Sequence, residues 1–217
     1  MGQLDTKSTR SWIRLGAGAL AVAGVLFVLY PAIRPFSDEA TLQGAAAFAS
    51  TAWIVAHMLA MAGFTLLMLG LLGLHLALEH TAVERLGFWA LVAGMVGVGL
   101  TLPFYGGEAF GLHAIGQEAV WRHDITLIKA TEVVRTGPQL LMFLVGLLLI
   151  GVSAIAGATA VWKSRALPKW SGVPFALGFA LYIPQFFGTQ PVRIAHGLLV
   201  TAGCLWLAAG LWQRARA

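Results

Sequence analysis

Long apolar runs constrain this chain more than any other feature of its sequence. Six stretches of about 20 residues carry almost no charge, at residues 12–30, 52–78, 86–103, 138–162, 170–187 and 192–212. A helix needs about 20 apolar residues to cross the hydrocarbon core of a bilayer. The sequence therefore predicts an all-α polytopic membrane protein, a single transmembrane domain over residues 1–217 with six transmembrane helices.

The composition agrees with this prediction. The chain is 59% hydrophobic and only 11% charged, whereas soluble domains carry about 25% charged residues. The net charge of +5 resides mostly at the ends of the apolar runs, where cytoplasmic loops of membrane proteins concentrate Lys and Arg. We therefore expect the lipid bilayer as a partner and no binding of nucleic acid. Cys204 lies within the last run and has no second cysteine to pair with.

The basic residues also predict an orientation. With the N-terminus inside, nine lie on the inner side and five on the outer side, the inner ones being Lys7, Arg10, Arg14, Arg85, Lys163, Arg165, Lys169, Arg214 and Arg216. This bias favours cytoplasmic N- and C-termini. The chain contains no Asn, has more Arg than Lys, and is rich in Ala, Gly and Leu. That usage is typical of a GC-rich bacterial genome and favours the bacterial inner membrane.

The run PFYGGEAFGLHAIGQ, from Pro103 to Gln117, places Glu108 and His113 among apolar side chains. It opens the long connection 104–137, which contains two amphipathic pieces of helical period. Such pieces are typical of helices that lie in the membrane interface. We expect this segment to lie along the outer membrane boundary and to roof a polar site.

The predicted topology brings several polar side chains to a similar depth near that boundary. Ionisable groups inside spans are costly and are functional candidates by default. The candidate ligand-binding residues are His57, Glu108, His113, Tyr182, Gln185, Arg193 and His196. Glu108 requires a cation, and Arg135 or Arg193 is the expected partner in an ion pair. Such a pair either only organises packing or holds a proton or cation.

Three classes of function fit these residues. The leading expectation is a small-ligand or ion-binding protein, a permease or transport accessory rather than an enzyme. Second, the chain is a haem- or metal-binding membrane oxidoreductase or other enzyme. His57 and His196 would be axial haem ligands, or would bind a divalent metal such as zinc together with Glu108 and, as a further candidate, His113. No HExxH or GxSxG motif occurs. Third, the chain is a structural or assembly subunit, with polar residues that only hold its roof in place.

Internal similarity suggests three consecutive hairpins. Three outgoing runs end in similar short sequences, Leu29-Tyr30-Pro31, Leu100-Thr101-Leu102-Pro103 and Leu181-Tyr182-Ile183-Pro184. Internal repeats are common in small transporters, although a chain rich in Leu, Ala and Gly also matches itself by chance. The third run carries Gly87, Ala90, Gly94 and Gly97 at helical spacing. Such a face permits close helix packing, including packing against a second copy in a homo-oligomer.

Overall fold

The structure is a computed structural model that describes the backbone of residues 2–216 and the side chains of residues 7–216. These residues form helices and no strand, as the sequence predicts. The helices are α1 (Gly2–Ile33), α2 (Leu42–Phe48), α3 (Thr51–Leu78), α4 (Glu84–Gly106), the π-helix η1 (Gly107–Gly111), α5 (Leu112–Arg122), the 3-10 helix η2 (Ile125–Ala130), α6 (Thr131–Arg135), α7 (Pro138–Ser164), α8 (Gly172–Ala180), the 3-10 helix η3 (Pro184–Phe187) and α9 (Gln190–Arg214).

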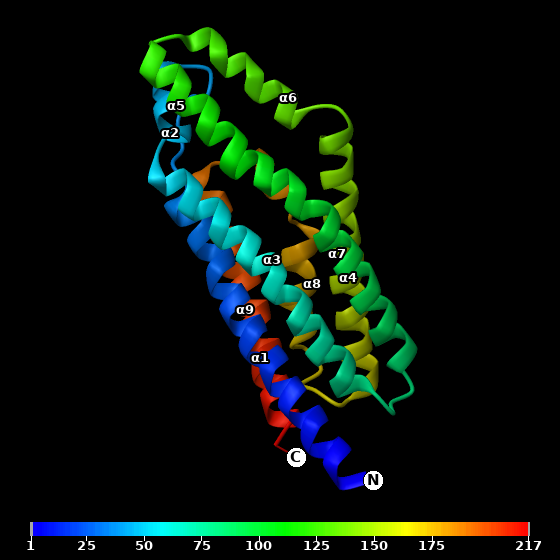
Figure 1. Ribbon diagram of the computed structural model, residues 1–217. Coiled ribbons are helices and arrows are strands. Elements are labelled where there is room, and N and C mark those ends of the chain that lie inside the picture. Colours follow the sequence, from blue (N-terminus) through cyan, green and yellow to red (C-terminus); the bar gives the residue numbers. More distant parts are fainter. Residues whose placement is uncertain (1, 217) are drawn as a thin grey trace.

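Five helical stretches of the described chain are long and apolar enough to cross a membrane. They are Lys7–Ile33, Thr51–Leu78, Glu84–Arg122, Pro138–Ser164 and Gln190–Arg214. They run side by side as an elongated bundle, with both chain ends at the same end of it (Figure 1). The fold is that of an all-α polytopic membrane protein.

The fifth predicted span, residues 170–187, is not one continuous helix. Its regular part, α8, has nine residues and is about 14 Å long, roughly half of the hydrocarbon thickness. A turn follows, and Pro184 opens η3. Proline lacks the N–H that an α-helix needs, and its ring clashes with the carbonyl group four residues earlier, here that of Ala180, where α8 ends. The break is therefore local to the proline.

The broken segment nevertheless packs against α9. Gly203 of α9 lies against Phe175, and Val200 of α9 lies against Gly178. The helices α1 with α3, α4 with α7, and α8 with α9 pack as neighbouring pairs, and α1 also packs on α9. This pairing fits three hairpins. The repeat stays a prediction, because pairing of consecutive helices does not show that the hairpins superpose.

The small-residue face of α4 is buried within the chain. A Cβ atom added to Gly97 would lie 2.7 Å from the carbonyl oxygen of Gly146 in α7, and one added to Gly94 would lie 2.3 Å from Leu71 in α3. These contacts use the face for packing against α3 and α7, so it is not open to a second copy.

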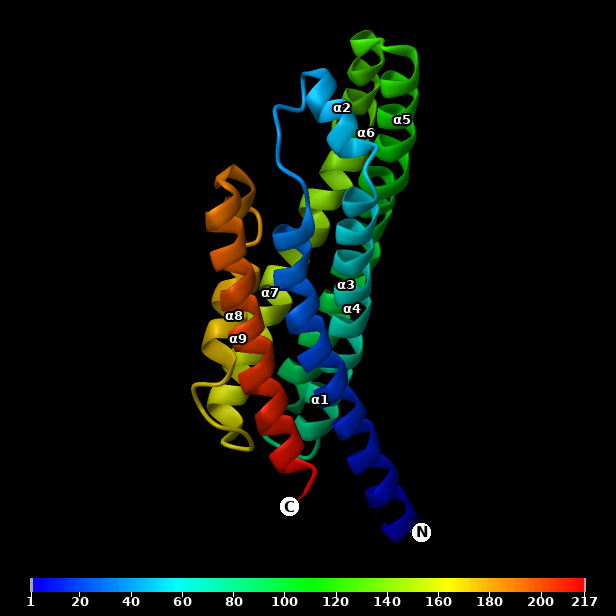
Figure 2. The same cartoon turned by 90° about the vertical axis from the view of Figure 1, so that its left-hand side faces the viewer.

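The sequence predicts that the third span ends at Pro103, but the helix does not end there. It continues through η1 and α5 to Arg122, and α5 projects from the bundle instead of lying across its end (Figure 2). Here α2, α5, η2 and α6 form a second small core, which we call the cap. Its buried apolar residues are Ala45, Phe48, Trp53, Leu112, Ala119 and Ile128. The apolar face of α5 is thus covered by α2 and not by lipid.

Candidate functional site

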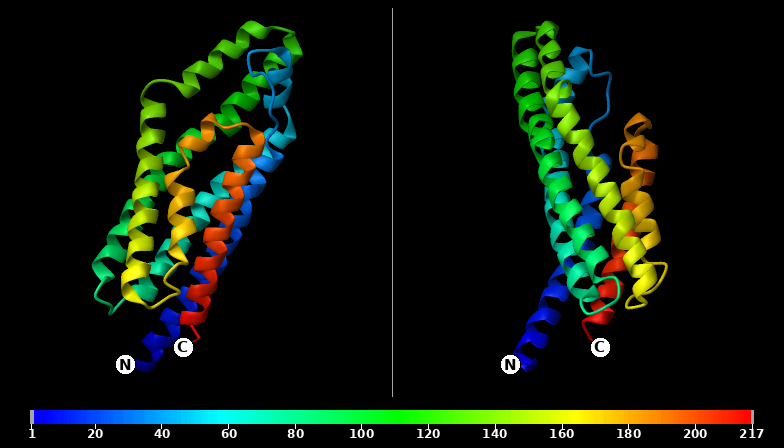
Figure 3. Two further views of the ribbon diagram at one scale, coloured as in Figure 1. Left: turned by 180° about the vertical axis from the view of Figure 1, so that it is seen from behind. Right: turned by 90° about the vertical axis from the view of Figure 1, so that its right-hand side faces the viewer.

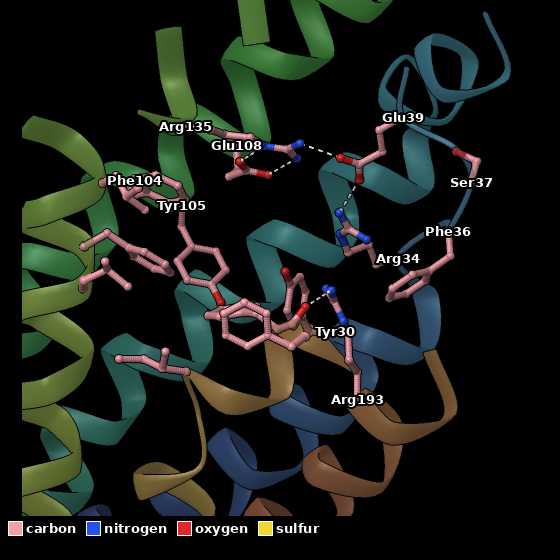
Figure 4. Close-up of a pocket in the computed structure, with 16 residues that line it drawn as sticks. Tyr30, Arg34, Phe36, Ser37, Glu39, Phe104, Tyr105, Glu108, Arg135 and Arg193 are labelled. Atoms are coloured by element: carbon pink, nitrogen blue, oxygen red, sulfur yellow. Dashed lines mark hydrogen bonds and ion pairs between the residues drawn. The ribbon is translucent and has the colours of Figure 1, made fainter. Parts of the chain in front are cut away.

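Four charged side chains form one connected network between the bundle and the cap (Figure 4). Arg135 donates two hydrogen bonds to the carboxylate of Glu108, from Nε at 2.6 Å and from Nη2 at 2.9 Å. Its Nη1 donates to Glu39 at 2.5 Å, and the second oxygen of Glu39 accepts from Nη2 of Arg34 at 2.8 Å. Such bidentate, charge-assisted bonds are among the strong ones in proteins. We call these four residues the charged network.

Local breaks in the helices place the members of the network. Glu108 lies in the π-helix η1 and is only 8% exposed; π-turns within α-helices are frequent at functional sites. The indole N–H of Trp53 fixes this turn by donating to the carbonyl oxygen of Glu108 at 2.7 Å. Arg135 ends α6, and Arg34 follows the last residue of α1. Three chain segments distant in sequence thus meet through their ends.

The network also shifts the ionisation of its members outside the membrane-spanning helices. Partial burial of Glu39 opposes its ionisation, but the charges and hydrogen bonds of Arg135 and Arg34 outweigh burial and lower the pKa of Glu39. Burial likewise opposes the charge of Arg135, and its bonds with Glu108 and Glu39 prevail and raise the pKa of Arg135. Both shifts favour the charged forms, so the network is held as ion pairs.

A cavity of about 620 Å³ lies beside the charged network, within the usual range of small-molecule sites. One end of it is polar and the other apolar. The residues that line it are Tyr30, Arg34, Phe36, Ser37, Glu39, Phe104, Tyr105, Glu108, Arg135, Leu140, Phe143, Leu144, Ile183, Phe186, Phe187 and Arg193. A concave site that joins a large apolar wall to a few convergent polar groups is typical of ligand-binding pockets.

Arg193 lines this cavity but does not bond to Glu108, its alternative partner in the sequence analysis. Its Nε donates to the carbonyl oxygen of Gly188 at 3.0 Å, and its Nη2 donates to that of Phe186 at 2.5 Å. Among the described side chains no carboxylate forms an ion pair with Arg193. Its charge is therefore not neutralised by the network.

The three tyrosines of the chain converge below the cavity. Tyr105 and Tyr182 place their hydroxyl oxygens 3.3 Å apart, and the rings of Tyr30 and Tyr105 pack at 5.8 Å. Each tyrosine lies within two residues of a proline near the end of an outgoing segment. Tyr30 and Tyr182 precede their prolines and Tyr105 follows Pro103, so the three positions are not equivalent and the repeat stays a prediction.

His57 lies behind the cavity wall, 1% exposed, and its ring has one satisfied nitrogen. Nδ1 donates to the carbonyl oxygen of Trp53 at 2.7 Å, because a carbonyl can only accept. Nε2 is buried without a hydrogen-bond partner and lies 3.9 Å from Oε2 of Glu108. A neutral imidazole would turn a lone pair toward this carboxylate. A proton on Nε2 would turn this contact into a favourable one between opposite charges.

The remaining predicted site residues lie elsewhere. His113 belongs to the cap, where Nδ1 bonds to the carbonyl oxygen of Phe48 at 2.8 Å. Tyr182, Gln185 and His196 line a second cavity of about 10 Å³, room for about one water molecule. His196 Nε2 bonds to the carbonyl oxygen of Gly178 at 2.7 Å. These residues adjoin the cavity beside the network and do not enclose one ligand site together with His113.

The geometry offers little to a metal or haem. Among the described residues no three His, Cys, Asp or Glu side chains gather as a metal-ligand set. His57 turns its free nitrogen toward Glu108, whereas His196 uses Nε2 for the backbone. Aromatic rings of Tyr30 and Trp53 pack against His57 at 5.3 and 4.4 Å, in the space that a macrocycle on this ring would need.

Several residues of the site were missing from the sequence-based set. They are Tyr30, Arg34, Phe36, Ser37, Glu39 and Tyr105. Arg34 and Glu39 lie between the first two apolar runs, in a stretch without helical or strand periodicity that would indicate how it folds. The tyrosines did carry a signal, since each of the three accompanies a proline at a span end.

Comparison with models of known protein families, with curated proteins and with solved structures finds no match in any of these three comparisons.

Proposed function

We propose that this chain is a multi-pass protein of the bacterial inner membrane that binds a small ligand or ion at its extracytoplasmic face, as a permease or an accessory to transport. The observation that carries this proposal is the cavity of about 620 Å³. Five charged side chains line it, although it adjoins a bundle of apolar helices. Charged side chains within such a bundle are costly, and they therefore usually mark a ligand site or a transport pathway.

The orientation in this proposal rests on the basic residues. They favour the end that holds both termini as the cytoplasmic side. The cavity lies at the level of Tyr30 and Arg193, at the opposite end of α1 and α9 from the termini (Figures 1 and 4). It would therefore face the extracytoplasmic side.

The broken segment α8–η3 supports a role in transport. Helices interrupted within a membrane bundle are tolerated where they line a cavity, and in many transporters they form the substrate site. Here Ile183, Phe186 and Phe187 lie at and beyond the break and line the cavity. The break thus lies beside the proposed ligand.

The central test is a ligand-binding assay on Glu108→Gln. The variant should insert into the membrane yet respond differently from the wild-type protein to ligands found in a thermal-shift screen, because it lacks the carboxylate that pairs with Arg135 at the cavity wall. Glu118→Gln, on the exposed face of α5, is the matched control and should respond as wild type. Wild-type responses from both Glu108→Gln and Leu144→Trp, which fills the cavity, would end the proposal.

The orientation has its own test. In a Cys204→Ala background, a membrane-impermeant maleimide added to spheroplasts should label Asp38→Cys, next to the cavity, and should not label Lys163→Cys at the other end of the bundle. Both positions are exposed. The reverse pattern would invert the topology and move the cavity to the cytoplasmic side.

A further inference from the structure

The charges around the cavity do not cancel. Three guanidinium groups, from Arg34, Arg135 and Arg193, face two carboxylates, from Glu39 and Glu108. Ion pairs join the charged network into a neutral set, and Arg193 is left over. The carbonyl oxygens that bind Arg193 carry no net charge. The cavity therefore holds one excess positive charge.

The same wall contains unused hydrogen-bonding groups. Arg34 is 7% exposed, and its Nε–H has no acceptor; the hydroxyl of Ser37, which also lines the cavity, is buried without a partner as well. Buried polar groups in native proteins are normally satisfied. An oxygen acceptor brought by a ligand would satisfy these groups.

Arg34 and Arg193 share an aromatic support. Their guanidinium carbons lie 4.8 and 5.2 Å from the ring centroid of Phe36, so that residues from the end of α1 and the start of α9 stand on one wall (Figure 4). A guanidinium has five N–H donors in a planar fork that matches a carboxylate or a phosphate. The polar end of the cavity thus has the chemistry of an anion site.

The other end of the cavity is apolar. Leu140, Phe143 and Leu144 of α7 face Ile183 and Phe186 of the broken segment. These two elements pack together lower in the bundle, where Gly151 approaches Phe179. They diverge toward the cap (Figures 2 and 3). At the rim Phe187 is 89% exposed and Leu141 is 65% exposed. Apolar side chains with this much exposure are typical of a lipid-facing surface.

We propose that the cavity takes a monoanionic amphiphile, with a carboxylate or phosphate head at Arg193 and Arg34 and an apolar tail between α7 and η3. This inference rests on the proposed function, since it names the class of ligand for that cavity. A cation would meet the excess positive charge, and a small inorganic anion would leave the apolar end unfilled. Only a ligand with both parts matches both ends.

The test is native mass spectrometry of the full chain in a neutral detergent. The probes are dodecanoate, dodecyl phosphate and dodecyltrimethylammonium, which share one tail and differ in the head. The wild-type protein should retain one molecule of either anionic probe. It should bind the cationic probe at least about tenfold more weakly, the difference expected for a charge-assisted contact. Arg193→Gln should lose this preference. Arg122→Gln, which removes an exposed cation of the cap outside the cavity, should keep it.

Cavity-filling variants separate this inference from the function on which it rests. Leu144→Trp should reduce retention of all three probes, whereas Leu148→Trp, one turn along α7 and 59% exposed, should not. If both probe charges bind equally in wild type and in Arg193→Gln, while Leu144→Trp still removes binding, the cavity stands and its anion preference is refuted. If the wild-type protein retains no probe, the amphiphile inference is refuted, whereas the proposed function still depends on the thermal-shift screen of the wild-type protein.

A competition arm identifies the source of the anionic head. Displacement of dodecanoate by phosphatidylglycerol would assign the site to a membrane lipid. Retention of dodecanoate in the presence of that lipid would assign it to a free amphiphile. Either outcome supports the anionic class.

Discussion

At the scale of single residues, Arg135 is the connection on which the charged network depends. It binds Glu108 and Glu39 at once, and its removal would leave the buried carboxylate of Glu108 without its partner. We expect Arg135→Gln to lower the free energy of unfolding by about 3 kcal/mol, the cost typical of breaking a buried ion pair. The double variant Glu108→Gln, Arg135→Gln should regain part of that loss.

Denaturant unfolding in detergent measures both changes. Arg122→Gln removes an exposed partner of Glu118 and should change stability by less than about 1 kcal/mol. Equal stabilities of the single and double variants would show that the charge left on Glu108 is not the cause.

Glu39 predicts a dependence of stability on pH. Its pKa is lowered in the folded state, so its contribution is fully present above the unfolded value of about 4.5 and is lost as the pH falls through the lowered folded value. The thermal midpoint of the wild-type protein should exceed that of Glu39→Gln at neutral pH, and the two should converge in acid. Glu132→Gln, at an exposed position of α6, should show no such difference at either pH.

The residues of the site were predictable only where burial forced a partner on them. Glu108 follows Thr101 and Gly94 at intervals of seven on the packed face of α4, so a cation was expected for it, and Arg135 provides that cation. Arg34 and Glu39 lie in the loop after α1. The sequence of this loop has no hydrophobic periodicity, so it does not indicate which way the two side chains point. Which residues share one cavity is decided by the meeting of helix ends, and spacing within one helix does not encode this.

At the scale of elements, the close contact of α4 with α7 depends on glycine. A Cβ on Gly97 would lie 2.7 Å from a backbone oxygen of α7, whereas Gly99 has open space around it. We expect Gly97→Ala to cost about 1–3 kcal/mol through overpacking. Gly99→Ala should be neutral or stabilising, because alanine has the higher helix propensity. Thermal midpoints of the two variants in detergent test this, and equal values would contradict the packing described here.

The element boundaries followed the sequence where a chemical signal marked them. Pro138 begins α7 at a position where its missing N–H costs nothing. Pro103 also predicted a helix end, and this prediction was wrong. The helix continues there because the turn of η1 and the packing of α2 support it. In residues 170–187 hydropathy alone predicted one helix, since apolar composition does not report the break at Pro184.

At the scale of the whole molecule, the chain has two cores that can be perturbed separately. Phe48 is fully buried in the cap, next to Trp53. We expect Phe48→Ala to cost the cap about 3–5 kcal/mol. Hydrogen exchange should then accelerate in α2 and α5 and stay slow in α7 and α9. Uniform acceleration along the chain would show that the cap and the bundle unfold as one unit.

The continuous helical stretch Glu84–Arg122 has 39 residues and is about 58 Å long, close to twice the thickness of the hydrocarbon core. From Glu108 to its last residue it rises by about 21 Å. The cavity therefore lies at the base of this helical extension. A large solute coming from the aqueous side would meet this extension before it met the cavity, so we expect an amphiphile to enter from the membrane plane, between α7 and η3.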